Sequence, residues 1–210
     1  MSIVSPNPLA SYLLPEPVLV VITGPSGAGK DSVIAEMRRQ GAEFQFIVTT
    51  TDRPMRVGEV EGVDYYFVST AEFQRLIASD ELFEHAEVYN QFKGVQKRHV
   101  REAVAAGRDT VMRVDIRGAR TIKRQLPGAV TVFVTPPSAR DLAERLSVRG
   151  TDQPEQMAHR LSIAEEEIAV AHTFDYVVIN RTGQLCDAAR QVLAIMEATR
   201  CRTDRIPLEL

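Results

Sequence analysis

The sequence predicts an α/β protein whose core is a doubly wound parallel sheet, with a small β-rich lobe and a helical lid inserted into it. Three observations predict this class: short apolar β-branched runs, helical patterns between them, and a glycine-rich loop after the first run. Alternating strands and helices are typical of a parallel sheet covered by helices on both faces. Ligands of such a sheet bind at the carboxyl ends of its strands.

The predicted core strands are short runs rich in β-branched and other apolar residues, which suits strands buried on both faces of a parallel sheet. They cover residues 18–23, 109–115, 130–135 and 174–180, with the sequences VLVVIT, DTVMRVD, VTVFVT and FDYVVIN. Helical patterns lie between them, over residues 30–40, 117–125 and 139–149. This order favours strand–helix–strand units rather than an all-β fold.

Two segments depart from the alternation and predict insertions. Residues 44–98 hold the closely spaced runs FQFIVTT, YYFVS, HAEVYN and FKGVQ with few long helices, which indicates a β-rich lobe. A lid over about residues 140–165 is predicted from an apolar stripe with 4-3-4-3 spacing on a helix that begins near TDQPE. The stripe consists of Met157, Leu161, Ala164, Ile168 and Ala171.

Composition limits the classes of function. A chain of 210 residues that is 44% hydrophobic and 25% charged suits one soluble domain with inserted lobes. A net charge of -3 argues against a surface that binds nucleic acid non-specifically, and no apolar run approaches the ~20 residues that span a bilayer. Cys186 and Cys201 have no histidine near them, which argues against a zinc site or a disulfide framework and favours a reducing, cytoplasmic setting.

The two ends of the chain are predicted to lie outside the domain, which covers residues 18–200. Residues 1–17 contain no Lys or Arg and lack the pattern of a signal peptide, so we interpret them as a flexible or loosely docked arm. We interpret residues 201–210 in the same way, because they are polar and Pro207 ends any helix.

The stretch GPSGAGKDS fits the phosphate-loop pattern G-x-x-x-x-G-K-[ST] except at its last fixed position, and it joins a predicted strand to a predicted helix. Its backbone N–H groups and the positive end of the helix dipole favour phosphate, and the lysine reaches the terminal phosphates. The core is therefore predicted to be of the P-loop NTPase type, with ATP held by Gly24, Pro25, Ser26, Gly27, Ala28, Gly29, Lys30, Asp31 and Ser32.

Asp31 stands where a hydroxyl residue is usual. A carboxylate a few Å from a triphosphate is repelled unless a cation lies between them, so we expect Mg²⁺ bound by Asp31 directly or through a water, with the Ser32 hydroxyl on a phosphate. A second interpretation is that Asp31 favours the first turn of its helix through the dipole, worth ~0.3–1 kcal/mol. The two roles are compatible.

A second anion site is predicted between Thr49 and Ser69. Arg53 and Arg56 lie three residues apart around Pro54, so their two guanidinium forks can converge on one anion, and Tyr65 can add a hydroxyl donor. Two arginines in a surface loop are usually only solvated. Beside a phosphate loop they favour a phosphate-bearing substrate.

Several motifs together resemble guanylate kinases: GPSGAGK, DRPMRVGEVEGVDYYFVS, FEHAEVYN, VDIRGARTIK, VTPPS, ERLSVRGTDQPEQMAHRLSIAEEE and FDYVVIN, in the order and spacing of that family. The resemblance covers about residues 18–198. It implies Mg²⁺-dependent phosphoryl transfer from ATP to GMP, giving ADP and GDP. It also implies a core with the phosphate loop, a GMP lobe, and a lid that closes over both.

The resemblance also implies roles for single residues. It places Arg53, Arg56 and Tyr65 on the GMP phosphate, Glu84 and Asp115 on the guanine N1 and 2-amino groups, and Thr49 near the base. In the lid it implies Arg145, Arg149 and Arg160, the last two neutralising the transferring phosphoryl group. Asn180 matches the position that contacts adenine. Taken singly, Glu84, Arg145 and Arg160 could be surface charges and Asp115 a strand-end cap.

Four positions depart from the family pattern. Lys93 stands for a second phosphate-binding tyrosine, Val95 for a Ser or Thr that reads the guanine O6, and Arg117 for a common glutamine. Asp31 itself departs from the usual GKS or GKG, and GKD also occurs in a kinase that phosphorylates ribose 1,5-bisphosphate. Lys93 keeps a donor and adds charge, whereas Val95 loses the hydroxyl that supports guanine selectivity.

Two alternatives stay open at this stage. One is a kinase for another phosphate acceptor, either a different nucleoside monophosphate or a sugar phosphate such as ribose 1,5-bisphosphate. The other is a non-catalytic interaction module with the same fold, which the intact Gly24, Gly29 and Lys30 disfavour. The expected partners are the small molecules ATP and GMP, with no nucleic acid and no membrane; the sequence gives no oligomeric state.

Overall fold

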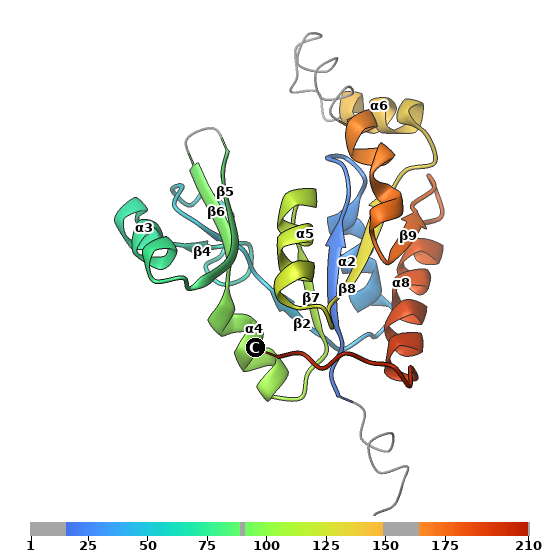
Figure 1. The fold of residues 1–210 in the computed structure, drawn as a ribbon. Coiled ribbons are helices and arrows are strands. Elements are labelled where there is room, and N and C mark those ends of the chain that lie inside the picture. The colour runs from blue at the N-terminus through green and yellow to red at the C-terminus, as the bar shows by residue number, and fades with distance from the viewer. Residues whose placement is uncertain (1–15, 89–90, 149–163, 210) are drawn as a thin grey trace, which may run out of the picture.

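The computed structural model describes residues 16–88, 91–148 and 164–209 (Figure 1). The predicted N-terminal arm up to residue 15 lies outside the described residues. So do Arg149, Arg160 and the part of the predicted apolar stripe that holds Met157 and Leu161.

The core is a five-stranded parallel sheet in the order β2-β7-β1-β8-β9. The strands are β1 (Leu19–Thr23), β2 (Gln45–Ile47), β7 (Thr110–Arg113), β8 (Val130–Thr135) and β9 (Tyr176–Ile179). The four predicted core strands are confirmed, and β1 is their centre. Chain order reverses on either side of β1, so the loop after β1 lies at the switch point where open α/β sheets bind ligands.

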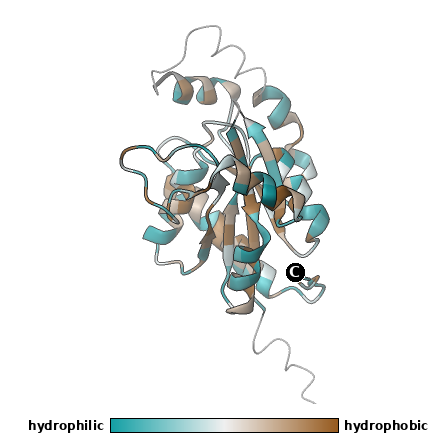
Figure 2. Ribbon diagram, turned by 90° about the vertical axis from the view of Figure 1, so that its left-hand side faces the viewer, coloured by the Kyte–Doolittle hydropathy of each residue, from teal (hydrophilic) through white to brown (hydrophobic). Residues whose placement is uncertain are grey.

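Alternate residues of β1 face two separate apolar clusters, because side chains point to opposite faces along a strand. Val20 and Ile22 pack with residues of α2 (Lys30–Arg39) and α8 (Leu185–Arg200). Leu19 and Val21 pack with residues of α5 (Ile116–Gln125) and α4 (Lys97–Ala105). Figure 2 shows hydrophobic colour concentrated on the inner strands and hydrophilic colour on the outer helices.

The β-rich lobe is a second sheet, in the order β4-β3-β6-β5, beside the core in Figure 1. Its strands are β3 (Thr50–Thr51), β4 (Tyr66–Phe67), β5 (Leu82–Val88) and β6 (Gln91–Gln96). β2 instead pairs with β7 in the core sheet, so the run FQFIVTT is divided between two sheets. The lobe strands therefore begin at Thr50, six residues after the predicted boundary at residue 44.

Two helices of this region are absent from the sequence prediction. The first is α3 (Thr70–Ala78), whose first turn is capped by Ser69 through its hydroxyl oxygen, which accepts from the Glu72 backbone N–H at 3.1 Å. Its residues Phe73 and Leu76 form a small core with Leu82. The second is α4, which leads back to the core and packs on it through Val100 and Ala103.

The predicted helix from residue 139 is confirmed as α6 (Ala139–Val148). Residues 164–169 are also helical, whereas Ala171 lies in the separate 3-10 turn η1 (Ala171–Thr173), so the predicted stripe does not continue on one helix to Ala171. Leu142, Leu146 and Ala164 form an apolar cluster. This cluster joins α6 to residues 164–169 above the carboxyl end of the core sheet (Figure 1).

The C-terminal tail is docked on the core rather than loosely attached. The Arg205 guanidinium donates to the backbone oxygens of Glu16 and Pro17 at 2.8 and 3.0 Å, and Leu208 packs against the α4–α5 face. Arg205 and Leu208 thus supply the contacts that a composition-based interpretation of a polar tail overlooks. Within the described part of the chain, no helix is both long and apolar enough to cross a membrane.

Candidate active site

The phosphate loop is pressed against the ends of β8 and β9, which makes two of its glycines obligatory. Gly24 has φ +132°, and a Cβ there would lie 2.0 Å from the Val134 carbonyl oxygen. Gly29 caps α2 with φ +86°, and a Cβ there would lie 2.5 Å from Asn180 Nδ2. Only a residue without a side chain permits both the left-handed backbone and these close approaches.

The Lys30 side chain folds back over the phosphate loop. Its Nζ donates to the Gly24 and Pro25 carbonyl oxygens at 2.7 and 2.9 Å. Burial, followed by the nearby charge of Arg113, lowers the pKa of Lys30 to about 8. An arriving phosphate would offer this ammonium a charged acceptor in place of two neutral carbonyls.

Asp31 projects from the first turn of α2 and forms an ion pair with Arg113, the last residue of β7. The Asp31 side chain is 70% exposed and that of Arg113 is 26% exposed. Arg113 is absent from the sequence prediction. Its place at the carboxyl end of a core strand, two residues before Asp115, is the signal that could have identified it.

Asn180 and Arg145 support the loop from behind. Asn180 is buried, and its Nδ2 donates to the Ala28 carbonyl oxygen at 2.9 Å. Arg145 donates to the carbonyl oxygens of Asn180 and Ala28 at 2.6 and 3.3 Å. The structure therefore places the predicted adenine contact and one predicted lid arginine on the backbone of the phosphate loop.

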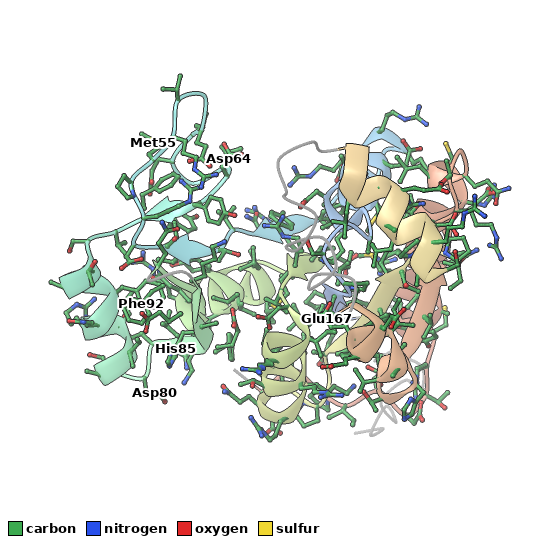
Figure 3. All side chains as sticks on the ribbon, turned by 90° about the horizontal axis from the view of Figure 1, so that it is seen from above. Met55, Asp64, Asp80, His85, Phe92 and Glu167 are labelled. Atoms are coloured by element: carbon green, nitrogen blue, oxygen red, sulfur yellow. The ribbon has the colours of Figure 1, made fainter. Side chains whose placement is uncertain are left out.

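Glu167 is a further carboxylate beside the loop that the sequence prediction missed. It lies on the helical residues 164–169 and is labelled in Figure 3. Burial raises the pKa of Glu167, the charge of Lys30 opposes this rise, and Asp115 adds to it. The run AEEE offers three glutamates, and only the fold selects the one that faces Lys30.

The predicted GMP-phosphate residues come together in the lobe. The Arg53 guanidinium lies 4.8 Å from the centroid of the Tyr65 ring, and Lys93 Nζ lies 5.8 Å from the same centroid. Arg53 is buried, and its Nη1 donates to Glu59 Oε2 at 2.7 Å. The Arg56 backbone N–H donates to the same oxygen at 2.8 Å, while its side chain is exposed.

Glu59 was not among the predicted residues, although it lies three positions after Arg56 in the quoted motif. Its hydrogen bonds with Arg53 and with the Arg56 backbone lower the pKa of its carboxyl to about 2. The carboxylate is thus the fixed partner of the lobe's buried arginine.

The two predicted guanine carboxylates meet where the lobe touches the core. Burial, followed by the charge of Asp115, raises the pKa of Glu84 to about 7. A Cβ on Gly118 would lie 2.9 Å from Glu84 Oε2, so the glycine makes room for this carboxyl. Asp115 Oδ1 accepts from the Gly118 backbone N–H at 2.7 Å, so Asp115 also caps α5.

Glu84, Asp115 and Arg117 line one cavity of about 480 Å³ together with Phe83 and His85. The cavity lies between β5 and the first turns of α5. Its size is within the range that holds small-molecule ligands.

Val95 is the direct cross-strand neighbour of Glu84 and is completely buried. It packs with Phe83 and Val100 in the apolar cluster on the α4–α5 face. Thr49 lies just before β3, and its carbonyl oxygen accepts from the Tyr66 backbone N–H at 3.0 Å. Its side chain is half-buried.

Comparison with known proteins agrees with this arrangement. A sequence model of the guanylate kinase family matches residues 16–199. The chain belongs to the guanylate kinase family.

Relatives match over almost the whole chain. The guanylate kinase of Symbiobacterium thermophilum is 42% identical over 191 residues, which cover 91% of this chain and 90% of that protein. The chloroplastic/mitochondrial guanylate kinase 2 of Oryza sativa is 41% identical over 202 residues, or 96% and 70% of the two chains. The crystal structure of guanylate kinase from Anaplasma phagocytophilum superposes with a TM-score of 0.71 at 30% identity, covering 90% and 89%.

A magnesium ion is expected for a guanylate kinase, and Asp31 at the phosphate loop is a suitable ligand for it. No cluster of three or more His, Cys, Asp or Glu side chains that could hold a metal occurs within the described ranges. Mg²⁺ does not require such a cluster, because one or two carboxylates, waters and substrate phosphates usually complete its shell. Asp31 supplies a carboxylate at the phosphate loop, so the residues fit the ion if Asp31 is released from Arg113.

Proposed function

We propose that this chain transfers the γ-phosphoryl group of ATP to GMP, forming ADP and GDP. The observation that carries the proposal is a set of charged groups that lie between the phosphate loop and the lobe. Lys30 and Asp115 interact electrostatically, and Asp115 likewise interacts with Glu84. On the neighbouring strands β5 and β6, Glu84 pairs with Val95 and Ala86 pairs with Lys93. These two pairs are on the same face of the lobe sheet, so Lys93 lies on the face that also carries Glu84.

We infer that Lys30 and the loop backbone hold the phosphates of ATP. The loop offers inward N–H groups at the start of α2, and Lys30 stabilises charge on the transferring group. Arg145 and Asn180 keep the loop in shape through the Ala28 carbonyl oxygen. Arg149 and Arg160 are proposed to neutralise the transferring phosphoryl group, as the family resemblance implies.

The GMP phosphate is proposed to bind Arg53, Arg56, Tyr65 and Lys93. The Arg53 guanidinium and Lys93 Nζ lie 4.8 and 5.8 Å from the Tyr65 ring centroid, so two cations gather around one tyrosine. Such a cluster suits a dianionic phosphate. Lys93 therefore replaces a family tyrosine without loss of a donor.

The guanine base is proposed to be recognised by Glu84 and Asp115, with Thr49 near its O6. Guanine presents N1–H and 2-amino donors, which two carboxylates can accept, whereas adenine has an acceptor at N1. Adenine would leave a buried carboxylate unpaired, which costs more than one neutral hydrogen bond. Binding of the base thus orients the phosphate of GMP, whose oxygen attacks the γ-phosphorus as the bond to ADP breaks.

Mg²⁺, held by Asp31 and the phosphates, would supply charge neutralisation during transfer. We also expect a cytoplasmic setting, in keeping with the two exposed free cysteines Cys186 and Cys201.

ADP release with ATP and a panel of acceptors tests the proposal: GMP, dGMP, AMP, CMP, UMP and ribose 1,5-bisphosphate. We expect kcat/KM for GMP to exceed that for AMP by more than about a hundredfold, because a site built on polar pairs rejects mismatched donors strongly. Equal use of AMP would contradict the assignment of Glu84 and Asp115. Preference for the sugar phosphate would replace the proposed acceptor.

A further inference from the structure

Asp31, the residue that fits the metal, forms an ion pair with an arginine. The Asp31 carboxylate is paired with the guanidinium of Arg113 across from the phosphate loop. A carboxylate binds both Mg²⁺ and a guanidinium strongly. The two cations repel each other, so the Asp31 carboxylate cannot bind both closely on the same side.

Arg113 also lies within electrostatic range of the phosphate-binding lysine. Its charge is the largest influence on the pKa of Lys30 after burial. Two cations thus stand at one loop, with Asp31 and Glu167 as the carboxylates that act on Lys30 alongside Asp115. Because the Arg113 side chain is only 26% exposed and ends β7, it is held at the edge of the sheet where ligands of this fold bind.

We propose that Arg113 sets the metal requirement of nucleotide binding, because Arg113 and Mg²⁺ are alternative partners of Asp31 at the phosphate loop. Without metal, Arg113 stays on Asp31, cancels its repulsion of the triphosphate and adds its own charge to that of Lys30. With metal, Asp31 turns to the ion and the guanidinium is released toward the phosphates. The inference rests on the proposed ATP site.

Substitutions of Arg113 and of Asp31 should change the affinities for metal-free ATP and for the metal in opposite directions. Arg113→Gln removes a cation and frees Asp31, so metal-free ATP should bind about tenfold more weakly while the ATP complex needs several-fold less metal. Asp31→Asn removes the repulsion, so metal-free ATP should bind several-fold more tightly while the complex needs more metal. A residue that only supported the fold would move both affinities in one direction.

Titration calorimetry with ATP in EDTA measures the first affinity, and electron paramagnetic resonance of free Mn²⁺ with the ATP complex measures the second. The matched control is Arg190→Gln, which breaks another Arg–Asp pair, with Asp187 on α8. The control should leave both affinities within about twofold of wild type, since an exposed pair on a remote helix adds little. Thermal melts establish that every variant is folded, and Arg113→Met, which keeps the aliphatic stem and removes the charge, replaces Arg113→Gln in any variant that is not.

The double variant Arg113→Gln/Asp31→Asn separates competition from simple charge. If Arg113 restrains Asp31, then Asp31→Asn should weaken Mn²⁺ binding more in the Arg113→Gln background than in wild type. Additive effects, or single variants that shift both affinities together, would overturn the inference while leaving the kinase activity in place. A wild-type protein that binds ATP neither with nor without metal would overturn the proposed function and this inference together.

Discussion

Glu59 holds Arg53 in a two-pronged ion pair on one loop of the lobe, six residues apart in the sequence. The pair fixes a buried guanidinium over the Tyr65 ring, at the place proposed for the GMP phosphate. The same carboxylate accepts from the Arg56 backbone N–H, so one acidic residue orients the Arg53 side chain and holds the Arg56 backbone. A negative side chain inside a phosphate site is thereby explained as a positioning group.

Glu59→Gln should raise the KM for GMP about tenfold and change kcat less than threefold. The amide cannot accept two charge-assisted hydrogen bonds, so Arg53 loses its fixed orientation before the substrate arrives. Steady-state kinetics with varied GMP at saturating ATP measure the split, and Glu43→Gln, on the exposed side of the core, is the charge-matched control. A lower KM in Glu59→Gln would instead identify Glu59 as a competitor of the phosphate.

Lys30→Met should lower kcat about 10²–10³-fold while making the protein more stable at pH 7. The pKa of Lys30 is lowered to about 8, so the charged form of Lys30 is less stable in the folded protein than in the unfolded chain. That penalty applies below about pH 8 and disappears as pH rises from about 8 to about 10.5, where the unfolded chain also loses the proton. Removal of the charge should therefore add roughly 1–3 kcal/mol to the free energy of unfolding at pH 7.

Urea unfolding at pH 7 and at pH 9.5 checks the stability of Lys30→Met, and turnover assays check kcat. Lys97→Met, which removes a lysine whose side chain is 14% exposed and paired with Asp80, serves as the control for charge. If kcat were retained, Lys30 would have no catalytic role.

GMP use should depend on the ionisation of Glu84. The pKa of Glu84 is raised to about 7, so below that pH the carboxyl is protonated, loses its charge and accepts more weakly from the guanine N1–H and 2-amino groups. KM for GMP should therefore rise about fivefold between pH 7 and pH 6. The Glu84→Gln variant should show a high KM and only the residual pH slope of the GMP phosphate, whose own pKa is about 6. If the KM of the wild-type enzyme for GMP showed only the same residual pH slope as that of Glu84→Gln, Glu84 would not contact the base.

The same carboxyl should make the free protein less stable at high pH. The folded protein keeps the Glu84 proton between about pH 4.5 and about pH 7, whereas the unfolded chain has lost it, so stability falls as pH rises through this window. At pH 8, Glu84→Gln should be more stable than wild type by roughly 1–3 kcal/mol. Guanidinium unfolding at pH 5 and pH 8 provides the measurement. A gain at pH 5 equal to that at pH 8 would point to packing instead of charge.

Val95→Thr should lower KM for GMP less than threefold and cost about 1–2 kcal/mol of stability. The added hydroxyl lies beside Glu84 on the same face of the sheet, but Val95 is completely buried among apolar side chains. A hydroxyl in that place loses water before it gains the base as a partner. Thermal melts without and with GMP compare the cost of burying the hydroxyl with the gain of the base as its partner. Bound GMP should recover part of the lost stability. No recovery would indicate that position 95 does not face the base.

The sequence by itself determined the core of this protein. Alternation of apolar strands with helical patterns predicted four of the five core strands, because β-branched and other apolar residues dominate strands that helices cover on both faces. The turn from Gly24 to Ser32 could likewise be placed between β1 and α2, because the fixed residues of the motif are close together in the sequence. The sequence did not predict α3 and α4, which lie in and beside the region interpreted as a β-rich lobe from its closely spaced apolar runs.

Only the tertiary structure decided which charged groups act together. Asp31 and Arg113, and likewise Lys30 and Glu167, are far apart in the chain, and their electrostatic interactions arise from the meeting of separate strands and helices. The sequence likewise could not show that Asn180 and Arg145 hold the Ala28 carbonyl oxygen. Local spacing encodes local contacts, whereas a pKa or an ion pair depends on distance in the folded chain, which is set by the packing of the whole sheet.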